Sequence, residues 1–143
     1  MMIMNKKKII GTLVTCTLLV LIISCSKENN FIPLYINNIK IEEIDKQDYD
    51  LVFKAAYKDT QTLECIIDNY FLVADELKIT GTGASFYDGK INLYVTTNNA
   101  WIDEDFIFVP YRISFELSGS GLNRRKCDIE LTLNGSIRTF EIN

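Results

Sequence analysis

The sequence predicts an all-β domain, built as an antiparallel sandwich or barrel, and three observations lead to this fold class. Apolar and polar residues alternate with a period of two over long stretches, as they do on strands with one buried face. The dipeptides Asp88-Gly89 and Asn134-Gly135 suit the two-residue turns that join antiparallel strands. A segment near the middle of the chain also recurs 38 residues later with its apolar positions in register.

Residues 1–24 are expected to be a targeting segment and not part of the domain. Lys6, Lys7 and Lys8 precede an apolar stretch of 15 residues, 9–23. This stretch is shorter than the roughly 20 residues that a membrane-spanning helix needs, and its basic flank is typical of an export signal. Three of the 15 basic residues lie in this leader, so the remaining chain carries 12 basic and 19 acidic side chains.

The leader ends in Leu21-Ile22-Ile23-Ser24-Cys25, which resembles the lipobox of bacterial lipoproteins. The resemblance implies cleavage between Ser24 and Cys25, diacylation of the Cys25 sulfur (a palmitate-type modification) and acylation of the new N-terminus. Several acyl chains on one residue anchor a protein stably in a membrane. Residues 25–32 are then expected to form a lipidated tether, and residues 33–143 a single all-β domain.

The residues after Cys25 predict where such a lipoprotein is sorted. No aspartate follows the cysteine directly, which in lipoproteins is associated with the outer membrane. The run Cys25-Ser26-Lys27-Glu28 is partly similar to the surface-export signals of Bacteroidetes-type lipoproteins. We therefore expect a lipid-anchored protein of the cell outer membrane, with the cell surface favoured over the periplasmic face.

Alternation is clearest over residues 49–58 and 107–117, and each of these segments is expected to be a half-buried strand. Pro110 lies inside the second segment and has no N–H to donate, which predicts an edge strand or a bulge. Residues 60–77 fit helical spacing as well as strand spacing. Their β-branched and aromatic residues favour a strand.

The two turn dipeptides predict two hairpins with defined registers. Type I′ turns need positive φ at both central residues, which Asp-Gly and Asn-Gly tolerate. Pairing outward from each turn brings apolar side chains opposite one another, and a slip of one residue would break this match. The expected pairs are Phe86 with Ile91, Ala84 with Leu93, Ile129 with Phe140 and Cys127 with Ile142.

The recurring segment predicts a twofold internal hairpin repeat. Residues 77–83 match residues 115–121, and residues 91–95 match residues 129–133. Each unit is expected to contain a strand, a Gly-x-Gly bend and a return strand, because glycine relieves strong bends and close backbone approaches. The pattern resembles small all-β lipoproteins of Bacteroidetes type, in which such a bend precedes an alternating strand.

Cys65 and Cys127 both lie in alternating segments and are expected to point inward. An exported chain meets an oxidising compartment, where a disulfide between them is one expectation and two separately buried thiols the other.

The segment from Trp101 to Asp105 is a candidate ligand-contact loop. Asp103, Glu104 and Asp105 supply carboxylates next to the only tryptophan, whose ring suits stacking on a sugar or a partner protein. The spacing matches no defined calcium loop, so no metal is expected. The alternative is a solvated acidic loop with Trp101 folded onto the core.

Arg124, Arg125 and Lys126 are expected at the tip of the second hairpin. A basic tip suits an anionic lipopolysaccharide or an acidic partner, and the alternative is an ordinary polar turn.

Composition narrows the classes of function. The chain has no histidine, which excludes Ser-His and Cys-His nucleophile pairs, and its acidic charge disfavours nucleic acid. We expect no enzyme and no cofactor, but a monomeric, lipid-anchored, non-catalytic binding or interaction module with a protein or glycan partner. One alternative is a lipocalin-like barrel carrying a small apolar ligand in a cavity lined by Phe53, Phe115 and Ile129. Another is an inhibitor or immunity lipoprotein.

Overall fold

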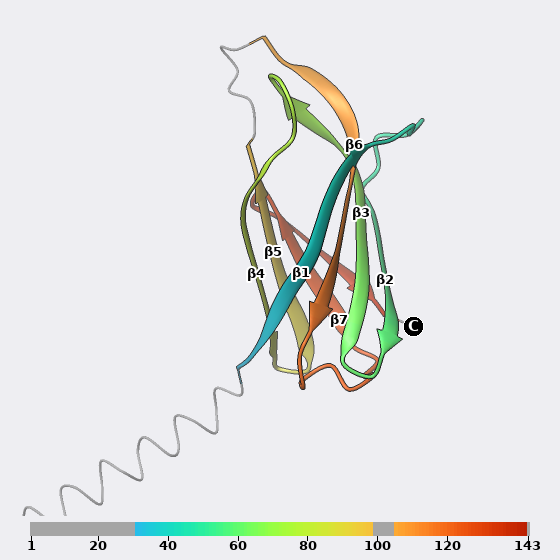
Figure 1. The fold of residues 1–143 in the computed structure, drawn as a ribbon, viewed down its shortest axis with the longest axis vertical. Helices are drawn as coiled ribbons and strands as arrows, with labels where there is room; N and C mark the ends of the chain where they lie inside the picture. Colours follow the sequence, from blue (N-terminus) through green and yellow to red (C-terminus); the bar gives the residue numbers. More distant parts are fainter. Residues whose placement is uncertain (1–30, 99–104, 143) are drawn as a thin grey trace, which may run out of the picture. The chain divides into compact units, whose positions relative to one another are not determined.

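The computed structural model describes residues 31–98 and 105–142, and all the elements in these ranges are β-strands (Figure 1). The Asp88–Gly89 and Asn134–Gly135 turns and the strand over residues 60–77 are found where the sequence predicts them. The strands are β1 (Ile32–Glu43), β2 (Val52–Asp59), β3 (Thr62–Val73), β4 (Ile79–Tyr87), β5 (Lys90–Thr97), β6 (Ile107–Ser118), β7 (Asp128–Leu133) and β8 (Ser136–Glu141).

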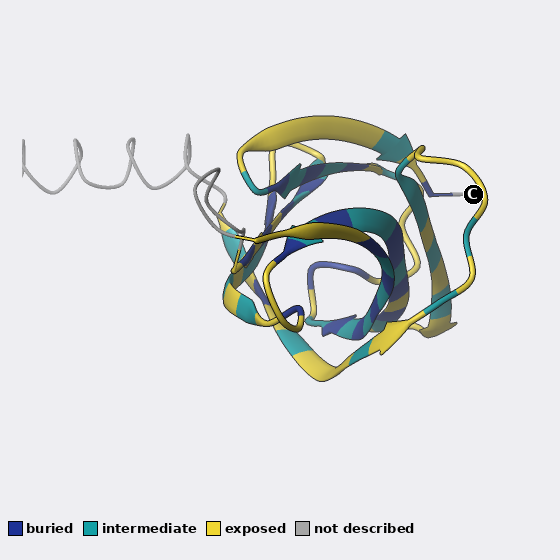
Figure 2. Ribbon diagram, turned by 90° about the horizontal axis from the view of Figure 1, so that it is seen from above, coloured by how far each residue is buried: buried dark blue, intermediate teal, exposed yellow. Residues whose placement is uncertain are grey.

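The eight strands form one sheet that curls into a nearly closed barrel. Their order across the sheet is β2-β3-β6-β1-β4-β5-β7-β8. Seen from above, the sheet surrounds a central region, and buried residues alternate with exposed ones along most strands (Figure 2). The all-β prediction is therefore confirmed, with a single curled sheet as the architecture.

Both predicted hairpins have the predicted register. Phe86 pairs with Ile91, and Ile129 pairs with Phe140. The φ angles are +52° at Asp88 and +75° at Gly89, and the second turn has the same pattern, with +48° at Asn134 and +83° at Gly135. These are the positive values that a type I′ turn requires at both central residues.

The expectation of a purely antiparallel sheet is wrong at one place, because β5 and β7 pair in parallel. Strand β6 has β3 on one side and β1 on the other, so it has no free edge for a return strand. The chain instead crosses one end of the barrel in the loop 119–127 and starts β7 beside β5. The second unit of the repeat is consequently not a hairpin.

The repeat nevertheless has a structural meaning. Its two return strands lie side by side, and Ile91 pairs with Ile129 while Leu93 pairs with Leu131. Residues that correspond in the sequence repeat are therefore neighbours in the sheet. Matching apolar side chains enter the core together from β5 and β7.

The Gly-x-Gly segments are not equivalent bends, contrary to the prediction. Gly81 and Gly83 lie inside β4, where the register with β5 shifts between Ile79 and Gly81. Gly119 and Gly121 follow β6 and begin the loop 119–127. A Cβ at Gly121 would lie 3.2 Å from Ile32 Cγ2, so this glycine permits a close approach between the loop and β1.

Pro110 does not lie on an edge strand, as the sequence suggested, nor at a register shift. It sits in β6, in the interior of the sheet, opposite Tyr70 of β3. Its carbonyl accepts a hydrogen bond from the N–H of Ile44, 3.1 Å away and just past the end of β1. In an antiparallel sheet, the backbone N–H and C=O of a residue point toward the same neighbouring strand. The missing N–H therefore faces the side on which β1 has already ended, and proline interrupts no ladder there.

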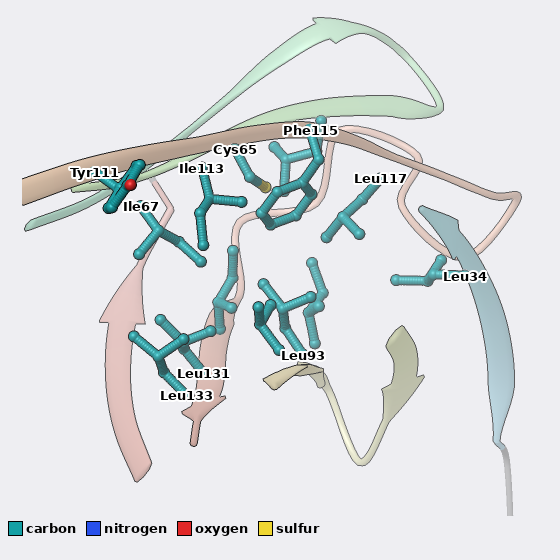
Figure 3. Packing of buried hydrophobic residues seen from close by; sticks show 14 of the residues in the cluster. Leu34, Cys65, Ile67, Leu93, Tyr111, Ile113, Phe115, Leu117, Leu131 and Leu133 are labelled. Atoms are coloured by element: carbon teal, nitrogen blue, oxygen red, sulfur yellow. The ribbon is translucent and has the colours of Figure 1, made fainter. Parts of the chain in front are cut away.

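The core lies inside the barrel and is formed by apolar side chains from all eight strands and the segments between them (Figure 3). Cys65 and Phe115, which pair across β3 and β6, project to the same side in this view, and Leu93 of β5 lies opposite them. The most completely buried side chains are Leu63, Cys65, Ile67, Val73, Ile91, Leu93, Val95, Ile113, Leu117, Leu122, Ile129 and Leu131.

The barrel closes through side chains between β2 and β8, which are the two edges of the sheet. The ring centroids of Phe53 on β2 and Phe140 on β8 lie 5.0 Å apart. A groove of about 270 Å³ lies between the end of β3 and the β7–β8 turn. We call this junction of β2 and β8 the seam.

Candidate functional surfaces

The interior of the barrel is occupied by packed side chains. Phe115 and Ile129, expected to line a cavity in a carrier, are buried members of the core, and Phe53 packs against Phe140. Figure 3 shows Phe115 surrounded by other core residues. The grooves described below open instead on the outer face of the sheet.

The first of these, the bulge groove, has a volume of about 590 Å³ and lies over an irregularity in β1. The pairing of β1 with β6 shifts between Asn37 and Lys40, and Asn38 has a φ of +54°. This bulge moves β1 away from a regular course beside β6. The groove is lined by Asn38, Ile39, Lys40, Glu64, Ile66, Ser114, Phe115 and Glu116.

Two glutamates of neighbouring strands meet in the bulge groove, since Glu64 pairs directly with Glu116. Glu116 accepts hydrogen bonds from Lys58 Nζ at 2.8 Å and Asn38 Nδ2 at 2.9 Å. The hydrogen bond from Lys58, followed by that from Asn38, lowers the pKa of Glu116. A glycosidase-type acid needs a carboxyl group that stays protonated. Glu116 is stabilised as a carboxylate, which is the opposite state.

The second, the aromatic groove, has a volume of about 470 Å³ and lies on the outer face of β1, β4 and β5. Its floor is the stretch of β4 from Gly83 to Ser85, and Phe31, Tyr87 and Tyr94 contribute exposed rings. A Cβ at Gly83 would lie 4.0 Å from Tyr94 Cδ2, so the ring edge is beside a position without a side chain. The lining residues are Phe31, Pro33, Gly83, Ala84, Ser85, Tyr87, Asn92 and Tyr94.

Two polar side chains that line the aromatic groove form no hydrogen bond with other described residues. No hydrogen bond joins the Ser85 hydroxyl to another residue within 31–98 and 105–142, and this oxygen is not among buried atoms without a partner, so it is accessible from the groove. The Asn92 amide likewise has none in the described part of the chain. Both side chains can therefore form hydrogen bonds with a molecule in the groove without breaking a contact within the described residues.

The loop 119–127, which carries the basic residues, is firmly attached to one end of the barrel. Leu122 is buried, and its carbonyl and that of Arg125 accept hydrogen bonds from the Tyr57 hydroxyl at 3.3 and 2.8 Å. The Arg125 guanidinium lies 5.2 Å from the centroid of the Phe86 ring, a cation–π arrangement. Burial raises the pKa of Tyr57. The predicted basic cluster, Arg124 to Lys126, is thus part of a structured loop rather than the tip of a hairpin.

The predicted ligand-contact loop lies largely outside the described residues. Trp101, Asp103 and Glu104 belong to the segment 99–104, for which the structure gives no description. Asp105 is described and is exposed at the start of the chain leading to β6. The three residues that follow it, Phe106, Ile107 and Phe108, are also exposed.

Cys65 is buried in the core and Cys127 is partly buried against it, and both thiols are unpaired in the structure. The disulfide between them stays a prediction. Cys65 lies in the middle of β3, where burial raises the pKa of its thiol to about 12. Cys127 precedes β7 and is half-buried. Burial also raises its pKa, with a further contribution from the neighbouring Asp128.

Within residues 31–98 and 105–142, no group of three or more His, Cys, Asp or Glu side chains is arranged to hold a metal ion. No helix in the same residues has the length and apolar character to cross a membrane.

Sequence reasoning missed the aromatic groove, because its residues come from three strands whose order is set by the fold. Phe31 and Tyr94 are 63 positions apart, and no spacing in the sequence connects them. One signal was present, namely a pair of glycines on a strand whose hairpin partner carries Tyr94 opposite Gly83. Glycine in a strand marks a place where another group approaches the backbone closely.

Comparison with family models, with curated proteins and with solved structures found no match for this chain.

Proposed function

We propose that this chain is a lipid-anchored protein of the cell envelope, held in the outer membrane through Cys25, that acts as a non-catalytic binding module. The observation that carries the proposal is the sequence Leu21-Ile22-Ile23-Ser24-Cys25 at the end of a basic and apolar leader. Strand β1 begins seven residues after Cys25. An extended tether of this length reaches about 25 Å at most, which keeps the barrel close to its anchor.

Binding at the outer surface agrees with the distribution of side chains. The interior is packed, whereas exposed aromatic residues and grooves occur on the outer face of the sheet. Exposed large apolar side chains that gather around a groove are typical of interaction sites. The alternative of a carrier for an apolar ligand needs interior space at Phe115 and Ile129, and these side chains are part of the packed core.

A non-catalytic role is supported by the chemistry of the described surface. The chain has no histidine, and the two glutamates of the bulge groove do not form an acid–base pair, because Lys58 and Asn38 keep Glu116 ionised. Catalysis by two carboxylates requires environments that push their pKa values apart, with one of them protonated.

Metabolic labelling with an alkyne analogue of palmitate tests the anchor. The wild-type chain should incorporate the label and sediment with membranes, and Cys25→Ala should abolish both. Cys16→Ala is the matched control, because Cys16 lies in the segment expected to be removed and should leave labelling unchanged. An unlabelled wild-type chain, or labelling that persists in Cys25→Ala, would overturn the proposal.

A further inference from the structure

We propose that the aromatic groove binds the neutral sugar rings of a glycan, with Tyr87 and Tyr94 as stacking surfaces and with Ser85 and Asn92 as hydrogen-bonding groups. This inference deepens the proposed function, since it names the ligand class of a binding module. It rests on the shape and chemistry of the groove itself, which do not depend on acylation of Cys25.

The rings of the aromatic groove are arranged for contact with a ligand and not for packing in the core. Tyr94 is 53% exposed and Phe31 is 61% exposed, although both flank a depression in the sheet surface. A sugar ring has one or two apolar faces of C–H groups, and aromatic side chains offer large apolar faces with a polar edge. The volume of about 470 Å³ is within the range typical of small-ligand sites.

The floor of the groove excludes recognition of a peptide by strand addition. Strand β4 has β1 on one side and β5 on the other, with Ser85 opposite Pro33 and Asn92. Strand addition requires an edge with unpaired backbone groups. A ligand on this floor must therefore be recognised by side chains alone.

The unused polar groups suit hydroxyl-rich ligands. Ser85 lines the groove, and its accessible hydroxyl forms no hydrogen bond with another residue of the described ranges. Asn92 lies beside it on β5 and also has an unpartnered side chain in that part of the protein. A hydroxyl and an amide both donate and accept, which matches the hydroxyl groups of a sugar. An acyl chain would leave both groups unsatisfied.

The absence of charge in the lining defines the ligand further. No acidic or basic side chain is among the described residues that line the aromatic groove. A sulfated, phosphorylated or uronic acid ligand would find no counter-charge there, and burying a charge without a partner is costly. The groove therefore favours uncharged sugars.

The test is calorimetric titration of the full-length protein, extracted in a detergent without a sugar headgroup. The probes are neutral hexasaccharides of glucose, mannose and N-acetylglucosamine, with a hyaluronan hexasaccharide as the charged comparison. At least one neutral probe should bind, and Tyr94→Ala and Tyr87→Ala should each weaken binding about ten-fold, because each removes a stacking face.

Two further variants make the result specific to the groove. Gly83→Val should abolish binding without unfolding the barrel, since a Cβ there meets nothing closer than 4.0 Å and the added methyl groups fill the floor. Tyr49→Ala is the matched control, because Tyr49 is an exposed tyrosine outside the groove and its loss should not change affinity.

Several outcomes would overturn this proposal. They are no binding of any neutral probe, binding of hyaluronan alone, and binding that survives both Tyr94→Ala and Gly83→Val. The Cys25→Ala protein separates this proposal from that of the anchor, since it should bind the neutral probe as tightly as the wild type. A failed labelling experiment with intact glycan binding would therefore remove the anchor and leave the groove.

Discussion

Asp68 and Arg112 form the best-defined ion pair of the described residues. They lie opposite each other on β3 and β6, and Arg112 donates two hydrogen bonds of 2.7 Å to the carboxylate of Asp68. The hydrogen bonds from Arg112 hold the pKa of Asp68 below its ordinary value of 3.8. The side chain of Asp68 is 13% exposed and that of Arg112 is 38% exposed, so water screens the pair in part.

Asp68→Asn should lower the free energy of unfolding by about 1–2 kcal/mol at neutral pH. A carboxyl group with a lowered pKa stabilises the fold above its unfolded pKa, and this contribution is lost as the pH falls through the folded pKa. The difference between wild type and Asp68→Asn should thus shrink below about pH 4 in urea unfolding experiments. Asp75→Asn, at an exposed position between β3 and β4, is the control. An unchanged difference at acid pH would refute this account of the pair.

The buried thiol of Cys65 predicts the behaviour at alkaline pH. Its pKa is raised by burial from 9.0 to about 12, so the unfolded chain loses this proton before the folded one does. The protonated thiol of Cys65 therefore contributes its full stability to the fold at pH values below the pKa of the unfolded chain. This contribution is lost as the pH rises toward the pKa of the folded chain. Under reducing conditions, the free energy of unfolding of the wild type should fall by about 1 kcal/mol more than that of Cys65→Ala between about pH 8 and 10.

Cys127→Ala is the matched comparison for that measurement, because it removes a thiol that is only half-buried. Cys127→Ala should still be destabilised at alkaline pH nearly as much as the wild type, whereas Cys65→Ala should not. If Cys65→Ala lost as much stability as the wild type, the thiol of Cys65 would not be in the buried environment described here.

Single residues differed in how well the sequence predicted them. The positive φ angles at Asp88 and Asn134 followed from the dipeptides alone, because the turn type requires them. The inward direction of Cys65 followed from alternation. Whether Cys65 lies within reach of Cys127 did not follow from the sequence, since that depends on the order of the strands. Ser85 was not identified, because its neighbour on β1, Pro33, is remote in the sequence.

At the scale of elements, the two copies of the Gly-x-Gly segment predict different tolerance to substitution. A Cβ at Gly121 would lie 3.2 Å from Ile32 Cγ2 and 3.4 Å from Phe86 Cβ, whereas a Cβ at Gly83 meets only Tyr94 Cδ2 at 4.0 Å. Gly121→Ala should destabilise the protein by about 1–2 kcal/mol through overpacking. Gly83→Ala, at the corresponding place in the repeat, should change stability by no more than about 0.5 kcal/mol.

Thermal or urea unfolding of the two alanine variants measures this contrast. Equal effects would mean that the loop 119–127 does not approach β1 as closely as described. The larger cost at Gly121 would show that one sequence motif serves two structural purposes, as a strand segment in β4 and as a loop start after β6.

The two hairpins whose turns carry Asp-Gly or Asn-Gly were predictable, whereas the pairing of the other strands was not. The β4–β5 and β7–β8 hairpins have two-residue turns that fix their register. Strand β1 was not identified at all, because the bulge near Asn38 interrupts its alternation and many of its residues are exposed. The parallel pairing of β5 with β7 was also missed, since it results from both edges of β6 being occupied.

At the scale of the whole molecule, the seam between β2 and β8 decides whether the sheet stays curled into a barrel. The rings of Phe53 and Phe140 join these edges. Phe53→Ala and Phe140→Ala should each destabilise the protein. The double variant should lose less free energy of unfolding than the sum of the two single losses. The difference should be about 0.5–1.5 kcal/mol, the typical interaction energy of an aromatic pair.

A double-mutant cycle in urea provides this coupling energy. Phe71 and Tyr111, an aromatic pair within the sheet on β3 and β6, offer a matched cycle away from the seam. Strictly additive effects of Phe53→Ala and Phe140→Ala would contradict closure of the barrel through this contact. The seam lay beyond sequence reasoning, because closure depends on the order of all eight strands.

Protease shaving of intact cells tests most directly the proposal of a lipid-anchored binding module, for which the cell surface is favoured over the periplasmic face. A site-specific protease sequence is inserted between Ala74 and Asp75, which are exposed in the connection between β3 and β4. The account predicts cleavage of the full-length protein on intact cells while a periplasmic protein stays whole. Protection of the inserted site until the cells are lysed would contradict it.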